Sequence, residues 1–240
     1  MTLPDPPPNW GHDEISKLID IARVNEYATF ANFKGEVNRL VDIDLSYRKV
    51  IDGLNHAKDW FAGFFVLRAH SNFFAGCRLC WSGQIPECYA ILRSSLENAL
   101  YGLYLARNPN SRETWLRRHD SDADKRKVKD EFKIRTMLDL AKSIDRAEGK
   151  VAELLYERTI DYGAHPNERA LMQMLQINEK AENVEFKIVY LEGNSDQLKL
   201  ALKTTAQVGV CALSLFRSVY RERFDILGVT GALDHIKKGL

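Results

Sequence analysis

The chain has 240 residues with a formal net charge of +1, and 45% of its residues are hydrophobic and 28% charged. These are values of an ordinary globular protein with one sizeable core, and they exclude a strong overall attraction to nucleic acid or lipid. The most apolar stretch, Trp60 to Ala106, is interrupted by arginine, histidine and glutamate, so we expect no membrane span.

The N-terminus, MTLPDPPP, lacks the basic and apolar regions of a secretory signal. Residues 1–12 are expected to form a proline-rich tail and residues 13–240 a single helical domain. Four cysteines fit a reducing compartment, so we expect a cytoplasmic protein.

The first half of the chain carries helical periodicity. A short helix is expected from Asp13, and a long amphipathic one from about Glu36, with apolar residues at three- and four-residue steps. Large apolar residues then become more frequent from Trp60 to Trp81, which predicts a helix at the centre of a bundle. Its phenylalanines form the core or, alternatively, a dimer interface or an apolar pocket: Phe61, Phe64, Phe65, Phe73 and Phe74.

The middle of the chain is punctuated by glycine and proline. The segment from Gly83 to Pro86 interrupts the helical pattern, and Pro86 suits the first turn of the next helix, expected to about Ala106. A short helix is predicted around Ser111 to Arg118. A single charged helix is predicted from Ser121 to Glu148, with Gly149 as its stop.

In the last third of the chain the hydrophobic pattern changes once, from helical periodicity to alternation. A helix is expected from Val151 to about Tyr162, and alternation from Val184 to Tyr190 suggests a strand. Asn194 or Ser195 should cap a last helix that runs to about Phe224. The sequence therefore predicts an all-α bundle of five to seven helices, with room for a short β-hairpin near residues 171–191. Because long helices this apolar often hide a face against a second copy, we expect a homodimer.

Common catalytic and cofactor signatures are missing from the sequence. No two glycines have the G-x-G spacing, which excludes the phosphate-binding loops of dinucleotide-binding and Walker-type proteins. The sequence also contains no Glu-x-x-His pair of the kind that binds iron in di-iron bundles. We expect no nucleotide cofactor and no metal.

The segment LLYERTIDYGAHPN sets an arginine and a histidine near a helix end, at Arg158 and His165. Gly163 and Pro166 end the helix between them or soon after, which lets both approach one phosphate. This spacing resembles the arginine–histidine motif of HEPN domains, helical proteins of similar size. The resemblance implies a metal-independent ribonuclease of a toxin or defence system. There His165 acts as general acid or base, Arg158 stabilises phosphate charge, and two subunits share one cleft. The structural alternative is a surface arginine and a helix-capping histidine.

A second polar pair lies within an otherwise apolar helix, where Arg93 and Glu97 are one turn apart. Arginine before glutamate is the weaker orientation for a surface pair, which indicates tertiary partners. The pair is either a buried structural ion pair or a polar spot that binds a ligand.

A basic run extends from Arg112 to Arg135, with nine Lys or Arg against six Asp or Glu, a net of +3. It is either a solvated helix face or a surface that faces phosphates. The candidate RNA-facing residues are Arg112, Arg117, Arg118, Lys125, Arg126, Lys127 and Lys129.

Cysteine spacing raises the question of a metal site, because Cys77 and Cys80 form a CxxC with His70 before it and Cys88 after it. Apolar neighbours on the same helical face favour small buried cysteines over zinc ligands.

Two functions fit the sequence. The first is a non-catalytic helical module that binds a partner or small ligand, and the second is the HEPN-like ribonuclease.

Overall fold

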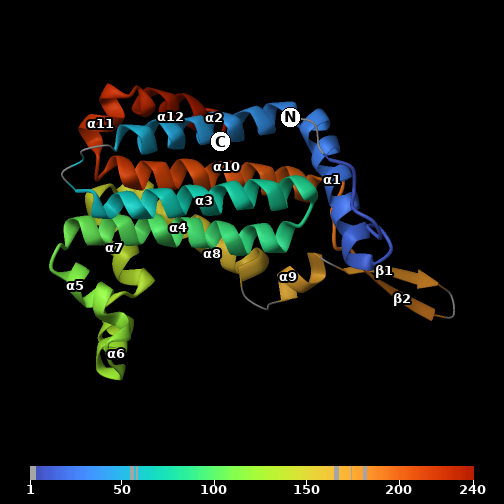
Figure 1. Ribbon diagram of the computed structural model, residues 1–240, viewed down its shortest axis with the longest axis horizontal. Coiled ribbons are helices and arrows are strands. Elements are labelled where there is room, and N and C mark those ends of the chain that lie inside the picture. Colours follow the sequence, from blue (N-terminus) through green and yellow to red (C-terminus); the bar gives the residue numbers. More distant parts are fainter. Residues whose placement is uncertain (1–3, 55–56, 58, 165–167, 174, 181–182) are drawn as a thin grey trace.

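The computed structural model of the chain describes residues 4–54, 57, 59–164, 168–173, 175–180 and 183–240. The protein is all-α, as predicted, and its long helices lie side by side in a bundle (Figure 1). Within this part of the chain six helices have 14 or more residues. None of the described helices combines the length and the apolar composition that crossing a membrane requires.

The first half contains α1 (Glu14–Asn32), α2 (Lys34–Gly53), α3 (Phe61–Ser82), α4 (Ile85–Arg107), α5 (Ser111–Leu116), the 3-10 turn η1 (Arg117–His119) and α6 (Asp122–Glu131). The second half contains α7 (Ile134–Ile144), α8 (Arg146–Thr159), the π turn η2 (Ile160–Ala164), α9 (Glu168–Gln173), β1 (Leu175–Lys180), β2 (Asn183–Ile188), α10 (Asp196–Arg217), α11 (Arg221–Ile226) and α12 (Val229–Lys237).

The core lies where α3, α4 and α10 pack together, with α2 alongside α10 (Figure 1). Phe73 of α3, Leu96 of α4 and Phe216 of α10 are all fully buried. At Gly209 of α10 an added Cβ would lie 2.6 Å from the Phe73 ring and 2.8 Å from Ile43, so the glycine lets α10 approach α2 and α3 closely. Phe61, Phe65 and Phe73 belong to the core as predicted. The prediction is wrong for Phe64 and Phe74, which are 57% and 56% exposed, because α3 is covered by other helices only on part of its surface.

The predicted cap residues begin and end these helices. The Asp13 carboxylate accepts the Ser16 N–H at the start of α1, and Ser195 accepts the Leu198 N–H at the start of α10. Gly83 ends α3 with a φ of 86°, and its carbonyl accepts the N–H of Glu192 at 2.9 Å. An added Cβ at Gly83 would collide with the Glu192 backbone, so glycine is required there.

The single helix predicted from Ser121 to Glu148 is wrong, because the chain forms α6, α7 and the start of α8 instead. Asp145 caps α8 by accepting the N–H groups of Ala147 and Glu148. Gly149, predicted as a stop, lies inside α8, where an added Cβ would be 2.4 Å from the backbone nitrogen of Lys142. The glycine therefore permits a close contact between α7 and α8 and does not end a helix.

The last helix predicted to reach Phe224 also ends early, at Arg217. The Tyr220 hydroxyl donates to the Asp59 carbonyl at 2.5 Å, and Phe224 is fully buried one turn later. These contacts with a distant part of the chain turn the backbone, so that α11 and α12 follow instead of a continued α10. The helix at Asp13 is longer than predicted, and Ile15 in its first turn is 74% exposed.

A β-hairpin occupies the predicted place, with β1 and β2 antiparallel and Leu175 paired with Ile188. It projects beyond the helices near α1 (Figure 1). Phe186, Ile188 and Tyr190 are exposed on or next to β2.

Candidate functional site

Arg158 lies in the last turn of α8, where it is anchored to α10. Its Nη1 donates to Gln207 Oε1 at 2.7 Å and to Thr204 Oγ1 at 3.3 Å. The other member of the predicted pair, His165, lies outside the described residues. The arginine is thus oriented by neutral acceptors, which leave its positive charge without a neutralising partner in these contacts.

Arg158 borders a shallow cavity of about 560 Å³ between α8 and η2. The other charged residues that line it are Lys150, Glu153, Glu157, Asp161 and Arg169, so cations and carboxylates are equal in number. Arg169 donates to Asp161 at 2.9 Å. At Gly163 an added Cβ would be 2.1 Å from the Pro86 carbonyl oxygen, so the glycine holds this segment against the start of α4.

Arg93 and Glu97 form the predicted ion pair, with Arg93 Nε 2.9 Å from Glu97 Oε1. Tyr156 of α8 completes a triangle: its hydroxyl accepts from Arg93 Nη2 at 2.7 Å and lies 3.2 Å from the same Glu97 oxygen. The guanidinium also lies over the Tyr156 ring, 5.0 Å from its centroid. Burial and the nearby Glu97 carboxylate raise the pKa of Tyr156. The group joins α4 to α8 and resembles a structural clamp.

Three of the seven candidate RNA-facing residues are held in ion pairs. Arg112 contacts Asp59 at 2.6 Å and donates to the Leu105 carbonyl, which fixes it against the bundle. Arg117 contacts Glu113 and Asp120, and Lys127 contacts Asp124 at 3.2 Å. Their charges are already partly neutralised within the chain.

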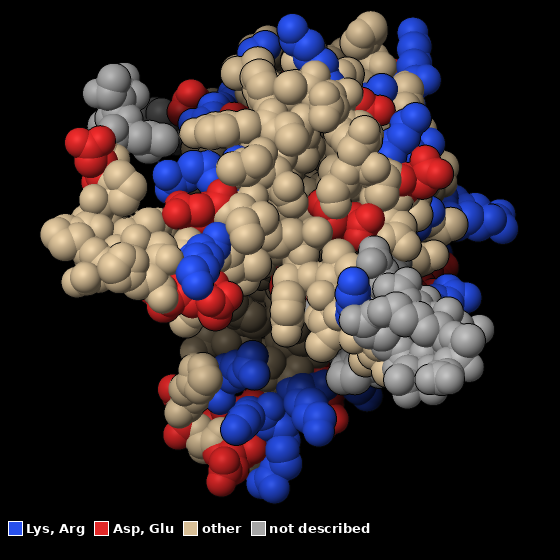
Figure 2. Space-filling model, turned by 90° about the vertical axis from the view of Figure 1, so that its right-hand side faces the viewer, with Lys and Arg blue, Asp and Glu red and all other residues tan. Residues whose placement is uncertain are grey.

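The other four candidates line one cavity of about 460 Å³ between α4, η1 and α6, together with Tyr101, Asp122 and Val128. We call it the basic hollow; its cations are Arg118, Lys125, Arg126 and Lys129. Among the described residues none of these four has an ion-pair partner. Figure 2 shows several Lys and Arg side chains, with Asp and Glu beside them, at the lower end of the molecule, where α6 lies in Figure 1.

The wall of the basic hollow includes an aromatic ring that the sequence did not single out for this site. Tyr101 stacks on Phe132, with ring centroids 5.6 Å apart, and its hydroxyl lies 3.5 Å from the Phe132 carbonyl. Burial, with the Glu97 carboxylate, raises the pKa of Tyr101, so its hydroxyl stays neutral at physiological pH. The only sequence signal was the position of Tyr101 four residues after Glu97, on an apolar helix.

The cysteines are placed as predicted. Cys80, Cys88 and Cys211 are buried and Cys77 is half-buried. Burial raises the pKa of the Cys80 thiol. His70 does not join the cysteines but contacts Asp44, with His70 Nε2 2.6 Å from Asp44 Oδ1. Over the part of the chain that the structure describes, no three His, Cys, Asp or Glu residues gather in a way that could hold a metal ion.

No model of a known protein family matches this chain, and no curated protein or solved structure matches it either.

Proposed function

We propose that the protein is a helical module that binds RNA through phosphate groups at the basic hollow, without catalysis. The observation that carries this proposal is the convergence of Arg118, Lys125, Arg126 and Lys129 on one cavity. Cations without internal partners keep their charge for an external anion.

The composition of the basic hollow favours a nucleotide chain over a lone anion. Four cations against Asp122 give a net charge of +3, enough for several successive phosphates. Phe65 and Phe132 stack on the Tyr101 ring, so only the rim of this tyrosine is left to contact an unpaired base. Looped or single-stranded RNA presents both phosphates and unpaired bases, so it is the ligand class that fits best.

A charge reversal tests the RNA-binding proposal. We expect Lys125→Glu/Lys129→Glu to weaken binding of a fluorescent RNA hairpin at least tenfold in an anisotropy titration at 100 mM salt. The salt dependence should also fall, because about two phosphate contacts are lost and each contributes a slope of roughly 0.7–0.9.

The matched control is Lys199→Glu/Lys203→Glu, which reverses two exposed lysines with the same four-residue spacing on α10. Equal losses in both double variants would mean that only net charge matters, and the basic hollow would then be refuted as the site. An unchanged affinity in the α6 variant would refute it as well.

The second candidate is the HEPN-like metal-independent ribonuclease, with Arg158 and His165 as its catalytic pair. The anchoring of Arg158 by Gln207 favours it, because a fixed guanidinium beside a cavity suits a phosphate whose charge rises in the transition state. The near balance of charges in that cavity places this candidate second.

Cleavage of the same RNA in EDTA separates the two candidates. The ribonuclease requires cleavage that falls at least a hundredfold in His165→Ala, because a general acid or base contributes about 10²–10⁴ in rate. His119→Ala, which removes a histidine that follows an arginine at the same spacing, is the control. We expect bound RNA to stay intact, and cleavage that is lost in His165→Ala alone would overturn the non-catalytic proposal.

The proposed module is a cytoplasmic homodimer. The free thiols of its four cysteines support a reducing compartment. Exposed apolar side chains on the long helices support a second copy.

A further inference from the structure

The outer face of α3, together with its N-cap residue Trp60, carries a stripe of exposed apolar side chains. Trp60, Phe64, Leu67 and Phe74 are 62%, 57%, 48% and 56% exposed, although neighbouring Phe61, Phe65 and Phe73 are buried. With Ser71 and Arg78 the stripe advances by alternate steps of four and three residues. This 3.5-residue period is the pattern of a helix that packs along a partner helix.

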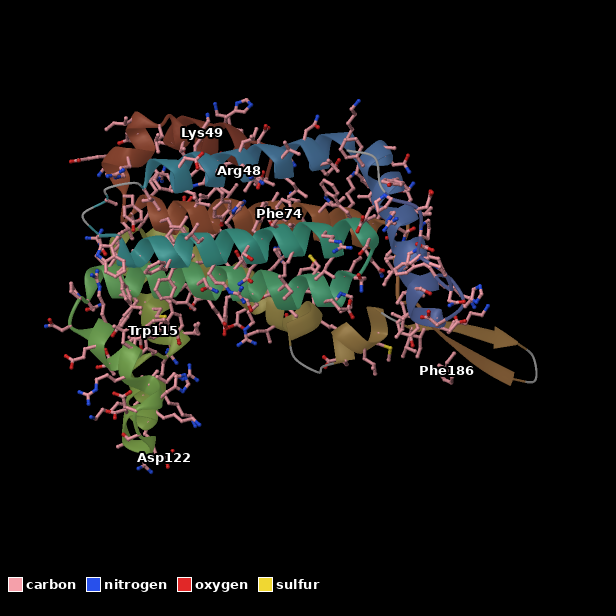
Figure 3. All side chains as sticks on the ribbon, in the orientation of Figure 1. Arg48, Lys49, Phe74, Trp115, Asp122 and Phe186 are labelled. Carbon is pink, nitrogen blue, oxygen red and sulfur yellow. The ribbon has the colours of Figure 1, made fainter. Side chains whose placement is uncertain are left out.

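The stripe continues onto α2, where Val41 and Leu45 are exposed. A cavity of about 270 Å³ separates the two helices, and both Val41 and Phe74 line it. Figure 3 marks Arg48 and Lys49 on α2 and Phe74 on the neighbouring α3. The contact between His70 and Asp44 fixes the alignment, so the middle of α3 lies beside the middle of α2.

We propose that this α2–α3 face binds a second copy of the chain, with α3 antiparallel to its own copy about a two-fold axis near Ala69. The axis would pass α2 near Leu45. In this register Phe64 of one protomer meets Phe74 of the other, and Leu67 meets Ser71. Trp60 meets Arg78, which contacts Glu26 at 3.4 Å but has a side chain that is 77% exposed and can lie on the indole face. Every pairing occurs twice, as an isologous interface requires.

The charges on α2 are complementary under the same axis. Asp42 lies three residues before Leu45, and Arg48 and Lys49 lie three and four residues after it. The two-fold therefore brings Asp42 of each protomer to the cations of the other. In the described part of the chain neither Asp42 nor Lys49 has an ion-pair partner. Oppositely charged ends flanking an apolar centre suit a second copy in the antiparallel orientation.

The apolar area is adequate for a dimer. From their exposed fractions, the six apolar side chains of the stripe present roughly 600–700 Å². A stable interface buries about 800 Å² on each partner, and the flanking polar side chains would supply the remainder.

The first test compares Leu67→Asp with Leu200→Asp, two leucines of similar exposure on α3 and α10. In sedimentation velocity over a concentration series, we expect the wild type to form a dimer. The dissociation constant of this dimer should be at least thirtyfold higher in Leu67→Asp. Leu200→Asp should behave as wild type. Circular dichroism of both variants establishes that each is folded.

The second test probes the axis itself. Leu45→Cys should form an intermolecular disulfide on mild oxidation, because two-fold-related residues at the axis bring their Cβ atoms to the 3.5–4.5 Å that a disulfide requires. Leu200→Cys and the wild type, with half-buried Cys77, measure the background. Asp42→Lys should weaken the dimer, and adding Lys49→Asp should restore it.

This interface rests on the proposed homodimer and is independent of RNA binding. A wild-type protein that stays monomeric at 100 µM would overturn both the homodimer and the interface. A dimer that is insensitive to Leu67→Asp, or that leaves Leu45→Cys uncrosslinked, would overturn the interface alone.

Discussion

Phe73→Ala is expected to lower the free energy of unfolding by about 3–5 kcal/mol. The Phe73 ring is fully buried and packs against Tyr47, with centroids 5.5 Å apart. Gly209 of α10 also approaches the Phe73 ring, and a glycine has no side chain that could move into the space. The cavity would therefore remain, and its cost adds to the lost transfer energy. Urea unfolding monitored by circular dichroism measures the loss.

Phe186→Ala is the matched control, because it makes the same chemical change at a ring that is 64% exposed on β2. We expect it to cost less than about 1 kcal/mol. Similar losses in both variants would contradict the placement of Phe73 at the centre of the bundle.

Glu97→Leu is expected to destabilise the protein by about 2–3 kcal/mol. The substitution removes the carboxylate that contacts Arg93, a side chain only 22% exposed, and it removes one partner of the Tyr156 hydroxyl. Removal of one member of a fully buried pair costs about 3–5 kcal/mol, and the partial exposure of this pair reduces that cost. Thermal unfolding at a fixed protein concentration measures the effect.

A double-mutant cycle with Arg93→Met distinguishes a clamp from independent residues. Arg93→Met/Glu97→Leu should cost less than the sum of the single changes by about 1–2 kcal/mol, because each single change already loses the contact between the two residues. Glu113→Leu, which removes an exposed four-residue pair with Arg117, should cost below about 0.5 kcal/mol. Additive losses at positions 93 and 97 would refute the clamp.

Local features of the sequence determined most helices of the first half. Apolar residues at three- and four-residue steps specify a helix wherever one face can be buried, and Asp13, Gly83 and Ser195 act on backbone groups within a few residues. These signals need no distant partner, so they can be interpreted from the chain alone.

The candidate sites were only partly predictable. The four-residue spacing of Arg93 and Glu97 placed both on one face of a helix, but nothing in the sequence joined them to Tyr156, 59 residues beyond Glu97. The basic run was evident, yet which cations pair internally and which line the basic hollow depends on how α5, η1 and α6 turn.

The sequence by itself determined an all-α chain with a phenylalanine-rich centre, a hairpin in its last third and a basic segment after α4. Only the tertiary structure decided where the later helices break and which phenylalanines of α3 face outward. Gly149 ends no helix and instead permits the close approach of α7, and Phe64 and Phe74 are exposed whereas Phe73 is buried. Such outcomes depend on contacts between segments far apart in the chain, and these contacts outweigh local propensities of less than about 1 kcal/mol per residue.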